Sequence, residues 1–508
     1  MRAMFVLEQL KKHAQAEEIA LLGSRDSLSF AQLDARSDAF AHWLFERFGS
    51  DKSPLLIYGQ KELDFLPCAF GALKSGRAYL PVDSILPPSR LAEILSNLTP
   101  CAVVDFTGTL SLPGHLVLDG DALLPILSSP LRAEFPRQNW VCGEDIAYIL
   151  FTSGSTGRPK GVPITADNLA AFYGGLLPFM GEAGGVILDQ VSYSFDVSGC
   201  SVYGGLSRGM TLLPVDRALS EDVGGLLDFL RASRLGFWVS TPSLAEICVR
   251  SKAFTQALLP ELHTFLFCGE VLTNALCDRL SERFPHARIL NTYGPTEATV
   301  LVTACTVTPE MRADSRPIPI GRPIEGVRLL LTDEDGKEIT ADGERGELLI
   351  LGRSVGPGYL GRPELSAARF FTHPATGLRG YRTGDICTRA GDLYYYHMRR
   401  DNQLKLHGHR VELEDVEANL ARIPNIAGAA VLPVWEDGRA QHLVAFILLK
   451  KADGLAPLGR AIAIKKAAAA LLPAYMIPRK FILLDAFPLN TSGKVDRKAL
   501  QARLDDAK

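Results

Sequence analysis

The chain has 508 residues, with 54 Lys and Arg against 57 Asp and Glu, which gives a formal net charge of −3. This near-neutral balance excludes the strongly basic field with which proteins attract nucleic acid or anionic lipid. Hydrophobic residues make up 47% and charged residues 22%, as in ordinary globular proteins, so a wholly disordered, collagenous or coiled-coil chain is also excluded. From the length we expect about three domains, or one large and one small domain.

The cysteines and the first residues of the chain indicate the cell compartment. The nine cysteines include no pair at Cys-x-x-Cys spacing, which favours a reducing compartment over a disulfide framework or a zinc site. The start, MRAMFVLEQLKKHAQAEE, becomes charged after a few apolar positions and predicts an amphipathic helix, not a signal peptide. No stretch reaches the ~18 uninterrupted apolar residues of a membrane span. We therefore expect a cytoplasmic protein without membrane insertion and without a nucleic-acid partner.

Short apolar runs alternate with helical patterns over the first two thirds of the chain. Between two of these runs, Leu91, Ile94 and Leu98 recur at helical spacing and predict a helix that begins near Pro88. The alternation predicts mainly parallel sheets covered by helices, in which ligands bind beyond the carboxyl ends of strands. The predicted strands are 55–59, 78–83, 101–106, 146–152, 210–216, 237–243, 264–270 and 287–294.

The pattern changes from about residue 320 onward. GVRLLLTDEDGKEI and GERGELLILG are typical of hairpin strands and predict a β-barrel-like subdomain. After residue 400 the pattern becomes a small α+β one, and the charged stretch 398–405 is the expected junction. Its predicted elements are a helix near 413–422, strands at 429–435 and 442–450, and a helix near 460–472. The fold class is therefore α/β, with a large N-terminal domain and a small C-terminal domain.

The loop 151–161, FTSGSTGRPKG, directly follows a predicted strand. Small residues let the backbone approach an anion, N–H and hydroxyl groups can surround phosphate oxygens, and a lysine adds charge. A Walker A loop is excluded because Gly-Lys-Ser/Thr is absent. A flexible surface loop is the weaker interpretation. The candidate phosphate-binding residues are Thr152, Ser153, Gly154, Ser155, Thr156, Gly157 and Lys160.

A second motif, NTYGPTE, ends at Glu297 and also follows a predicted strand. Tyr293 could cover a base, Thr296 could bond phosphate, and Glu297 could hold Mg²⁺ through oxygen. Taken alone, the motif is simply a turn with a solvated carboxylate.

Three more motifs carry charged residues. In YRTGD, Asp385 follows a predicted tight turn and could bond a ribose diol, or it could be an Asx-turn aspartate. The run RRDNQLKLHGHR, from Arg399, is by itself a basic surface segment. In NTSGKVDR, Lys494 lies on a turn and by itself would be a solvated lysine.

In order and spacing, the five motifs together resemble the adenylate-forming superfamily, which includes acyl-CoA synthetases, luciferases and the adenylation domains of nonribosomal peptide synthetases. The resemblance covers nearly the whole chain. It implies an N-terminal core over residues 1–400, a mobile C-terminal domain over 401–508, and an active site between them. It also implies that ATP and Mg²⁺ convert a carboxylate into an acyl adenylate and pyrophosphate, after which the acyl group passes to a thiol.

The resemblance assigns nucleotide contacts to the motifs. The 151–161 loop would hold the β- and γ-phosphates, Tyr293 would pack on adenine, and Asn291 would contact the edge of that base. Asp385 would bond the ribose, with Arg399 nearby.

Three further roles are implied by the same resemblance. Glu297 would ligate Mg²⁺, and Asp401 would be the hinge on which the small domain rotates. Lys494 resembles the catalytic lysine that bridges the substrate carboxylate and the α-phosphate. A cation placed there stabilises the charge that spreads over oxygens in the transition state.

The substrate is indicated by smaller features. Asp196, in VSYSFD, corresponds to the aspartate that pairs with the α-ammonium in amino-acid-activating relatives; otherwise it is an N-cap. Cys268, in FCGEVL, resembles the cysteine near the small side chain in the D-alanine–D-alanyl carrier protein ligase family; otherwise it is a small buried hydrophobe. Val300 is expected to line the same pocket.

This closer resemblance implies activation of D-alanine and its transfer to the phosphopantetheine thiol of a carrier protein, for lipoteichoic-acid-type D-alanylation. One alternative is a stand-alone adenylation enzyme for glycine, L-alanine or serine, which loads a carrier protein in natural-product or envelope biosynthesis. An alternative of another class is a non-catalytic nucleotide-binding scaffold.

Overall fold

The computed structural model describes residues 4–15, 17–130, 133–154, 157–181, 183–406, 408–436, 439–451, 454–488 and 495–505. The chain forms two compact units. The first unit consists of Met1–Ser84, Asn97–Leu150 and Gly161–Arg400, and the second of Ile85–Ser96, Phe151–Lys160 and Asp401–Lys508. Two short early segments thus group with the C-terminal residues, and the domain limits 1–400 and 401–508 remain a prediction.

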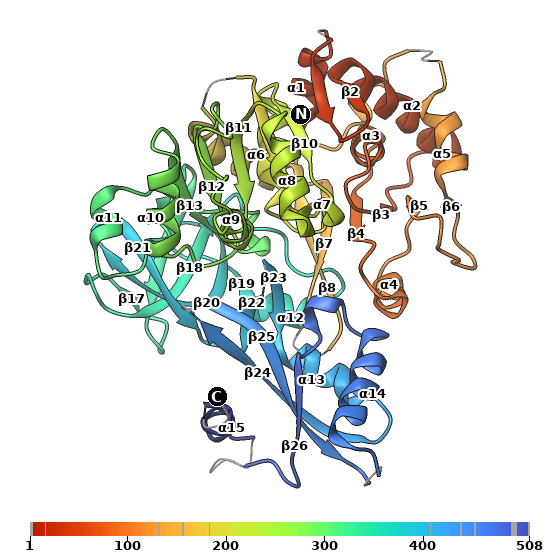
Figure 1. The fold of residues 1–508 in the computed structure, drawn as a ribbon. Coiled ribbons are helices and arrows are strands. Elements are labelled where there is room, and N and C mark those ends of the chain that lie inside the picture. The colour runs from red at the N-terminus through yellow and green to blue at the C-terminus, as the bar shows by residue number, and fades with distance from the viewer. Residues whose placement is uncertain are drawn as a thin grey trace. The chain divides into compact units, whose positions relative to one another are not determined.

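A nine-stranded sheet in the first unit has a parallel centre and antiparallel edges (Figure 1). Strand pairs are parallel from β1 through β10, β9, β11 and β12 to β13, whereas β2, β14 and β15 pair antiparallel. The strands in spatial order are β15 (Arg322–Pro323), β14 (Thr303–Thr306), β13 (Arg288–Tyr293), β12 (Thr264–Phe267), β11 (Leu235–Ser240), β9 (Val186–Asp189), β10 (Thr211–Pro214), β1 (Ile19–Leu22) and β2 (Ser27–Ser29).

A six-stranded sheet holds the earlier predicted strands. Its pairs from β6 through β5, β3 and β4 to β7 are parallel, and the central strands β3 and β4 are buried along their whole length. The strands in order are β6 (Val117–Leu118), β5 (Ala102–Asp105), β3 (Leu55–Gly59), β4 (Tyr79–Asp83), β7 (Ile146–Thr152) and β8 (Lys160–Thr165). These two sheets confirm the prediction of mainly parallel sheets in an α/β fold.

Two further sheets follow in the chain. The first, mainly antiparallel, consists of β17 (Glu338–Ile339), β16 (Val327–Thr332), β18 (Gly346–Gly352), β20 (Arg379–Ala390) and β19 (Phe370–Thr372), with β21 (Leu393–Arg399) paired to β20. The second, in the second unit, consists of β23 (His409–Glu412), β22 (Gln403–Leu406), β25 (Arg439–Leu449) and β24 (Ile426–Glu436), with β26 (Lys480–Leu483) paired to β25.

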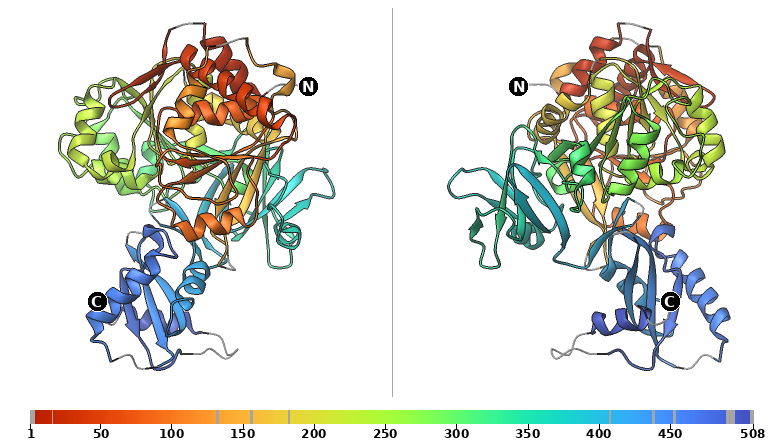
Figure 2. Two further views of the ribbon diagram at one scale, coloured as in Figure 1. Left: turned by 90° about the vertical axis from the view of Figure 1, so that its right-hand side faces the viewer. Right: turned by 60° about the vertical axis from the view of Figure 1, so that its left-hand side comes forward.

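Helices cover these sheets, and local signals set several of their ends. Ser29 and Gln32 form a capping box at the start of α2, and Pro88 occupies the first position of α4. In Figure 2 the red helices near the N-terminus lie close together, and α2 packs against both α1 and α3. The α-helices are α1 (Phe5–His13), α2 (Phe30–Phe48), α3 (Phe65–Lys74), α4 (Pro88–Leu95), α5 (Gly120–Leu127), α6 (Ala166–Leu176), α7 (Arg217–Glu221), α8 (Val223–Arg231), α9 (Pro242–Cys248), α10 (Asn274–Arg283), α11 (Pro309–Ala313), α12 (Pro363–Arg369), α13 (Leu413–Ala421), α14 (Pro457–Ala469) and α15 (Arg497–Asp505).

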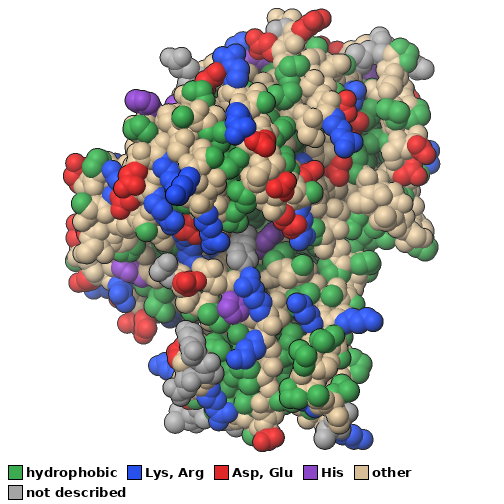
Figure 3. All heavy atoms as spheres, viewed as in Figure 1, with side chains coloured by type: hydrophobic (Ala, Val, Ile, Leu, Met, Phe, Trp, Pro, Cys, Tyr) green, Lys and Arg blue, Asp and Glu red, His purple; other side chains and the backbone are tan. Residues whose placement is uncertain are grey.

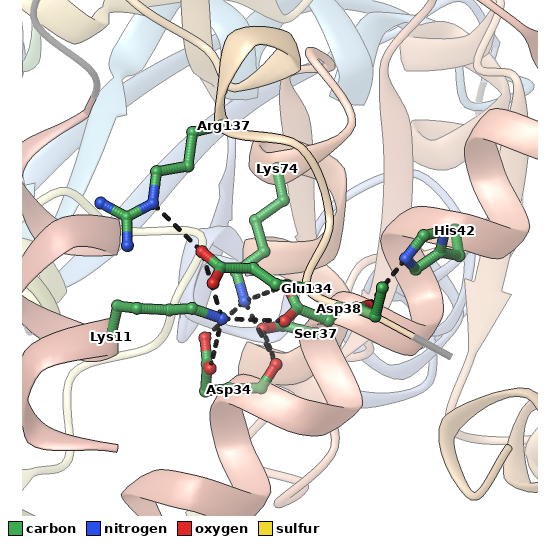
Figure 4. A network of polar contacts seen from close by, with 9 residues as sticks. Lys11, Asp34, Ser37, Asp38, His42, Lys74, Glu134 and Arg137 are labelled. Carbon is green, nitrogen blue, oxygen red and sulfur yellow. Dashed lines mark hydrogen bonds and ion pairs between the residues drawn. The ribbon is translucent and has the colours of Figure 1, made fainter. Parts of the chain in front are cut away.

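A buried charge network joins the first three helices (Figure 4). The Lys74 ammonium donates to Asp34 at 2.6 Å and to Asp38 at 2.7 Å, and its side chain is fully buried. Lys11 of α1 reaches the other carboxylate oxygens at 2.9 and 3.0 Å. The two lysines therefore neutralise the two buried carboxylates, as buried charges require, and Lys11 also lies 3.5 Å from the more exposed Glu134.

Charged residues on the surface, the apolar length of the helices and the state of the cysteines each bear on an expectation from the sequence. Lys and Arg are interspersed with Asp and Glu over the face in Figure 3. No helix within the described part of the chain is long and apolar enough to cross a membrane. The nine cysteines, all of them described, are free thiols.

Candidate functional site

Several predicted site residues follow neighbouring strands of the nine-stranded sheet. Asp196 lies in the loop after β9, Cys268 follows β12, and Tyr293 ends β13. These strands run parallel, so their carboxyl ends meet at one edge of the sheet. That edge is where α/β sheets bind ligands.

The structure brings Asp196 and Thr296 into direct contact. The Thr296 hydroxyl donates to the Asp196 carboxylate at 2.6 Å, and both residues are buried. From the sequence, Asp196 was predicted to bind the substrate ammonium and Thr296 to bond a phosphate. Their contact therefore brings the residues predicted for the amino acid and for the phosphate next to each other.

Backbone strain marks the turn that carries Val300. Thr299 and Val300 have φ of 62° and 72°, a left-handed conformation that β-branched residues rarely adopt. The Thr299 hydroxyl donates to the Ser354 carbonyl at 2.6 Å and holds this turn. Such strain persists only where the surroundings fix it, and it clusters at functional sites.

Cys268 and Val300 pack in the same buried region. Cys268 is 1% exposed, and its thiol lies 3.9 Å from the Val300 carbonyl oxygen. A Cβ added to Gly199 would lie 3.2 Å from Val300 Cγ2, so Gly199 packs closely against Val300. Burial raises the pKa of the neighbouring Cys200 thiol well above its usual range, and the proximity of Cys268 adds to the rise. The two residues that were predicted to line the substrate pocket, Cys268 and Val300, are therefore neighbours.

The residues that were predicted to bind adenine and ribose are also in contact with each other. The Tyr293 hydroxyl donates to Asp385, and Arg399 pairs with the other carboxylate oxygen at 3.0 Å. Burial raises the pKa of Tyr293 well above its usual range, and Asp385 raises it further, so the phenol stays protonated. Asn291 is buried, and its amide donates to the Pro319 carbonyl at 2.8 Å.

The predicted tight turn before Asp385 is wrong. This residue lies inside β20, where the pairing with β18 is irregular and Gly384 has φ of 74°. The Gly384 N–H donates to Glu347 Oε1 at 3.1 Å. A β-bulge therefore takes the place of the turn and re-aims the side chain, as bulges do beside active sites.

Glu297 is fully buried, and the Tyr359 hydroxyl donates to its Oε1 at 2.8 Å. A carboxylate oxygen is a hard ligand of the kind that Mg²⁺ prefers. Among the described residues no group of three His, Cys, Asp or Glu forms a complete metal cage. Mg²⁺ is commonly held by one or two carboxylates together with substrate phosphates, so Glu297 fits this ion.

In the second unit, the described part of the 151–160 segment is held by C-terminal residues. The Ser153 hydroxyl donates to the Arg410 carbonyl at 2.9 Å and accepts the Glu412 N–H at 3.2 Å. Lys160 lies 3.8 Å from the Glu412 carboxylate. Burial raises the pKa of Glu412, whereas Lys160 opposes that rise.

Two features of this loop suit an anion. The Thr152 hydroxyl is buried and has no hydrogen-bond partner within the described ranges, so it is a donor left for a ligand oxygen. Gly157 has φ of 77°, and a Cβ there would lie 2.7 Å from the Ala418 Cβ. Only glycine fits this position without strain. Gly154 is buried in the same loop.

Some predicted residues lie outside the described part of the structure, namely Ser155, Thr156 and Lys494. Asp401 is the first residue of the last segment of the second unit, and its carboxylate accepts the Gln403 N–H at 3.3 Å. Its hinge role stays a prediction.

Several buried polar contacts were missed by reasoning from sequence. Tyr359 bonds Glu297, Lys61 bonds Asp189 at 2.9 Å, and Arg90 forms an ion pair with Asp415. Each pair is far apart in the chain.

Family models match both parts of the chain. The AMP-binding enzyme model covers residues 8–360, and the AMP-binding enzyme C-terminal domain model covers 415–494. The chain is 38% identical to two proteins named D-alanine–D-alanyl carrier protein ligase, one from Bacillus anthracis (strain CDC 684 / NRRL 3495) and one from Bacillus thuringiensis (strain Al Hakam). Each match covers 98% of this chain and 99% of the relative.

Solved structures agree with the fold. The chain is 27% identical to holo-PA1221, a nonribosomal peptide synthetase protein with adenylation and PCP domains, with a TM-score of 0.83, covering 99% of this chain and 84% of that one. The Vibrio cholerae adenylation domain AlmE, solved with glycyl-adenosine-5'-phosphate, matches with a TM-score of 0.84 and 23% identity over 99% and 97% of the two chains, which supports the fold alone. This chain belongs to the AMP-binding enzyme family, in the branch of the D-alanine–D-alanyl carrier protein ligases.

Proposed function

We propose that this protein is an ATP-dependent, AMP-forming ligase that activates D-alanine and transfers it to the phosphopantetheine thiol of a carrier protein. The observation that carries the substrate assignment is the 38% identity, over 98% of the chain, to ligases of that name. The buried Asp196 carboxylate supports an amino acid over a plain fatty or aryl acid, because it lies at the position that pairs with the substrate ammonium in amino-acid-activating relatives.

In the first half-reaction, an oxygen of the D-alanine carboxylate attacks the α-phosphorus of ATP. A new C–O–P linkage forms, the bond from that phosphorus to the bridging oxygen breaks, and pyrophosphate leaves. Asp196 would bind the ammonium, and the Asp385 carboxylate would bond the ribose beside Tyr293. Lys494 would supply the cation that stabilises the charge developing on the phosphate oxygens.

Two groups of this chain would serve the phosphates. Glu297 would ligate Mg²⁺, which neutralises phosphate charge when it is bound. The N–H and hydroxyl groups of the 151–161 loop, including the buried Thr152 hydroxyl, would bond the β- and γ-phosphate oxygens.

In the second half-reaction, the carrier thiol loses its proton and its sulfur attacks the carbonyl carbon of the adenylate. AMP leaves with the bridging oxygen, and a thioester remains. We propose lipoteichoic-acid-type D-alanylation in the cytoplasm as the setting, and the nine free thiols agree with a reducing compartment.

The substrate assignment is tested by ATP–pyrophosphate exchange with D-alanine, L-alanine, glycine and serine. We expect D-alanine to give the highest kcat/KM. A preference for another amino acid would refute the substrate and favour the sister ligase. ATP binding without exchange for any acid would favour a non-catalytic nucleotide-binding scaffold.

The role of Lys494 is tested by separating the two half-reactions. Lys494→Ala should abolish most adenylate formation but spare transfer from preformed D-alanyl adenylate to a carrier thiol. Lys498→Ala is the control, since Lys498 lies on α15 outside the motif. Equal loss in both half-reactions would contradict the assigned role.

A further inference from the structure

Asp189, the last residue of β9, is a fully buried carboxylate that accepts three side-chain hydrogen bonds. Its Oδ1 receives the Lys61 ammonium at 2.9 Å and the Ser201 hydroxyl at 2.7 Å, and its Oδ2 receives the Tyr193 hydroxyl at 2.7 Å. The same ammonium lies 3.6 Å from the centre of the Tyr193 ring. The charges of Lys61 and Asp189 balance each other, and their side chains are 3% and 0% exposed.

These bonds fix the segment 190–200, which carries Asp196. Asp189 precedes the segment, Tyr193 lies within it, and Ser201 follows it in the π-helix η3 (Cys200–Gly205). Inside the segment, the Ser192 hydroxyl also donates to Asp83, at the end of β4, at 2.7 Å. The backbone around Asp196 is therefore anchored on both sides by side chains from other elements.

Stability alone is a poor explanation for this network. Apolar residues of similar volume often replace a buried ion pair without loss of stability, because desolvation offsets the attraction between the charges. Burial lowers the pKa of the Lys61 ammonium, which reflects this desolvation, while Asp189 opposes it. A polar network of fixed geometry does set the direction of the groups attached to it.

We propose that Lys61 and Asp189 are positioning residues, which hold segment 190–200 so that the Asp196 carboxylate meets the ammonium of the amino acid. The proposal rests on the proposed function. Neither side chain contacts substrate in this scheme. Their effect should therefore appear in the use of the amino acid and not in the use of ATP.

The test compares two buried lysines in the full-length protein. Lys61 and Lys74 have side chains 3% and 0% exposed, and both pair with carboxylates, but Lys74 belongs to the helix network in Figure 4. Lys61→Met and Lys74→Met therefore remove the same group from equally buried sites. KM for D-alanine and for ATP is measured by pyrophosphate exchange, alongside thermal unfolding.

We expect Lys61→Met to raise KM for D-alanine by roughly 10- to 100-fold, the usual cost of a misplaced binding group, while KM for ATP changes by less than about twofold. Lys74→Met should lower the melting temperature and leave the ratio of the two KM values unchanged. The proposal is overturned if both variants change that ratio equally, or if Lys61→Met leaves it at the wild-type value.

A milder pair of variants covers the case in which Lys61→Met does not fold. Ser201→Ala removes one hydrogen bond to Asp189, and Ser37→Ala removes a matched buried hydroxyl that donates to the Asp34 carbonyl at 2.8 Å. Only Ser201→Ala should raise KM for D-alanine, by about fivefold. An equal response in the two variants would refute the positioning role.

The two proposals fail in different ways. If wild-type protein prefers another amino acid, the D-alanine assignment is wrong, and the Lys61 comparison is then made with that amino acid. If no amino acid supports exchange, both proposals are wrong.

Discussion

The ion pair between Arg90 on α4 and Asp415 on α13 is buried, and this burial gives a quantitative prediction. The guanidinium Nη2 donates to both carboxylate oxygens, at 2.7 and 2.6 Å, and the side chains are 4% and 0% exposed. Arg90→Met keeps an apolar stem but leaves the carboxylate buried without its cation. Breaking a buried pair in this way costs about 3–5 kcal/mol.

Two observations place the expected cost near the lower end of that range. The Asn419 amide still donates to Asp415 at 2.8 Å in the variant. Burial already raises the pKa of Asp415 against the effect of Arg90, so without the arginine this carboxyl can take up a proton more easily. We therefore expect a loss of about 3 kcal/mol.

A second ion pair between α4 and the C-terminal residues provides the control. Arg422 donates to Glu93 at 2.8 Å, but the side chains are 50% and 19% exposed. Exposed pairs contribute about 0–1 kcal/mol, so Arg422→Met should have little effect.

Hydrogen exchange measured by mass spectrometry on α13 peptides, in the full-length protein, reports the local free energy of opening. Arg90→Met should speed their exchange by roughly 100-fold, and Arg422→Met by less than about fivefold. The double variant Arg90→Met/Asp415→Leu should recover most of the protection, because neither charge is left buried. Equal exchange in the two single variants, or no recovery in the double variant, would refute the reasoning.

Three further predictions concern the loop, the helix network and the nucleotide residues. Gly157→Ala should lower the free energy of unfolding by about 1–2 kcal/mol in urea titrations, because φ is 77° and the new Cβ meets Ala418; an unchanged midpoint would contradict this. Burial raises the pKa of Asp34, but the nearby lysines outweigh burial and the net pKa is lowered. The ionised Asp34 therefore stabilises the fold fully above its ordinary pKa of 3.8, and this stabilisation is lost as pH falls through the lower folded-state pKa. Asp34→Asn should accordingly weaken the decrease of the melting temperature at acid pH. An unchanged dependence of the melting temperature on pH would contradict this prediction. Tyr293→Phe removes the hydroxyl that bonds Asp385 and should raise KM for ATP about 10-fold while sparing KM for D-alanine; an equal rise in both would contradict the nucleotide role.

Much of the fold could be predicted because its strands are short apolar runs with clear ends. The predicted strands 55–59 and 146–152 match β3 and β7, and the helix predicted to begin near Pro88 is α4. The hairpin of β20 and β21 was not predicted, because RGYRTGDICTRA mixes charges with glycine and lacks regular alternation. This segment forms a strand because β20 pairs with β18, a long-range contact that the local sequence does not indicate.

The site shows the same limit. Asp196 and Cys268 were predicted from their position after strands and from resemblance, whereas Asp385, which lies inside β20, was predicted from its motif and from resemblance. Lys61 could not be predicted, because Gln-Lys-Glu resembles a solvated turn, and its partner Asp189 lies 128 positions away. Contacts of that kind depend on tertiary packing, which the spacing of residues in the chain does not reveal.

The balance of charge among the first three helices has a consequence for shortened forms of the chain. Lys11 supplies one of the two ammonium groups that face Asp34 and Asp38. Without α1, the two carboxylates would share Lys74 alone, and one negative charge would lose its cation. A chain cut after His13 should therefore unfold at a lower temperature than the full-length chain.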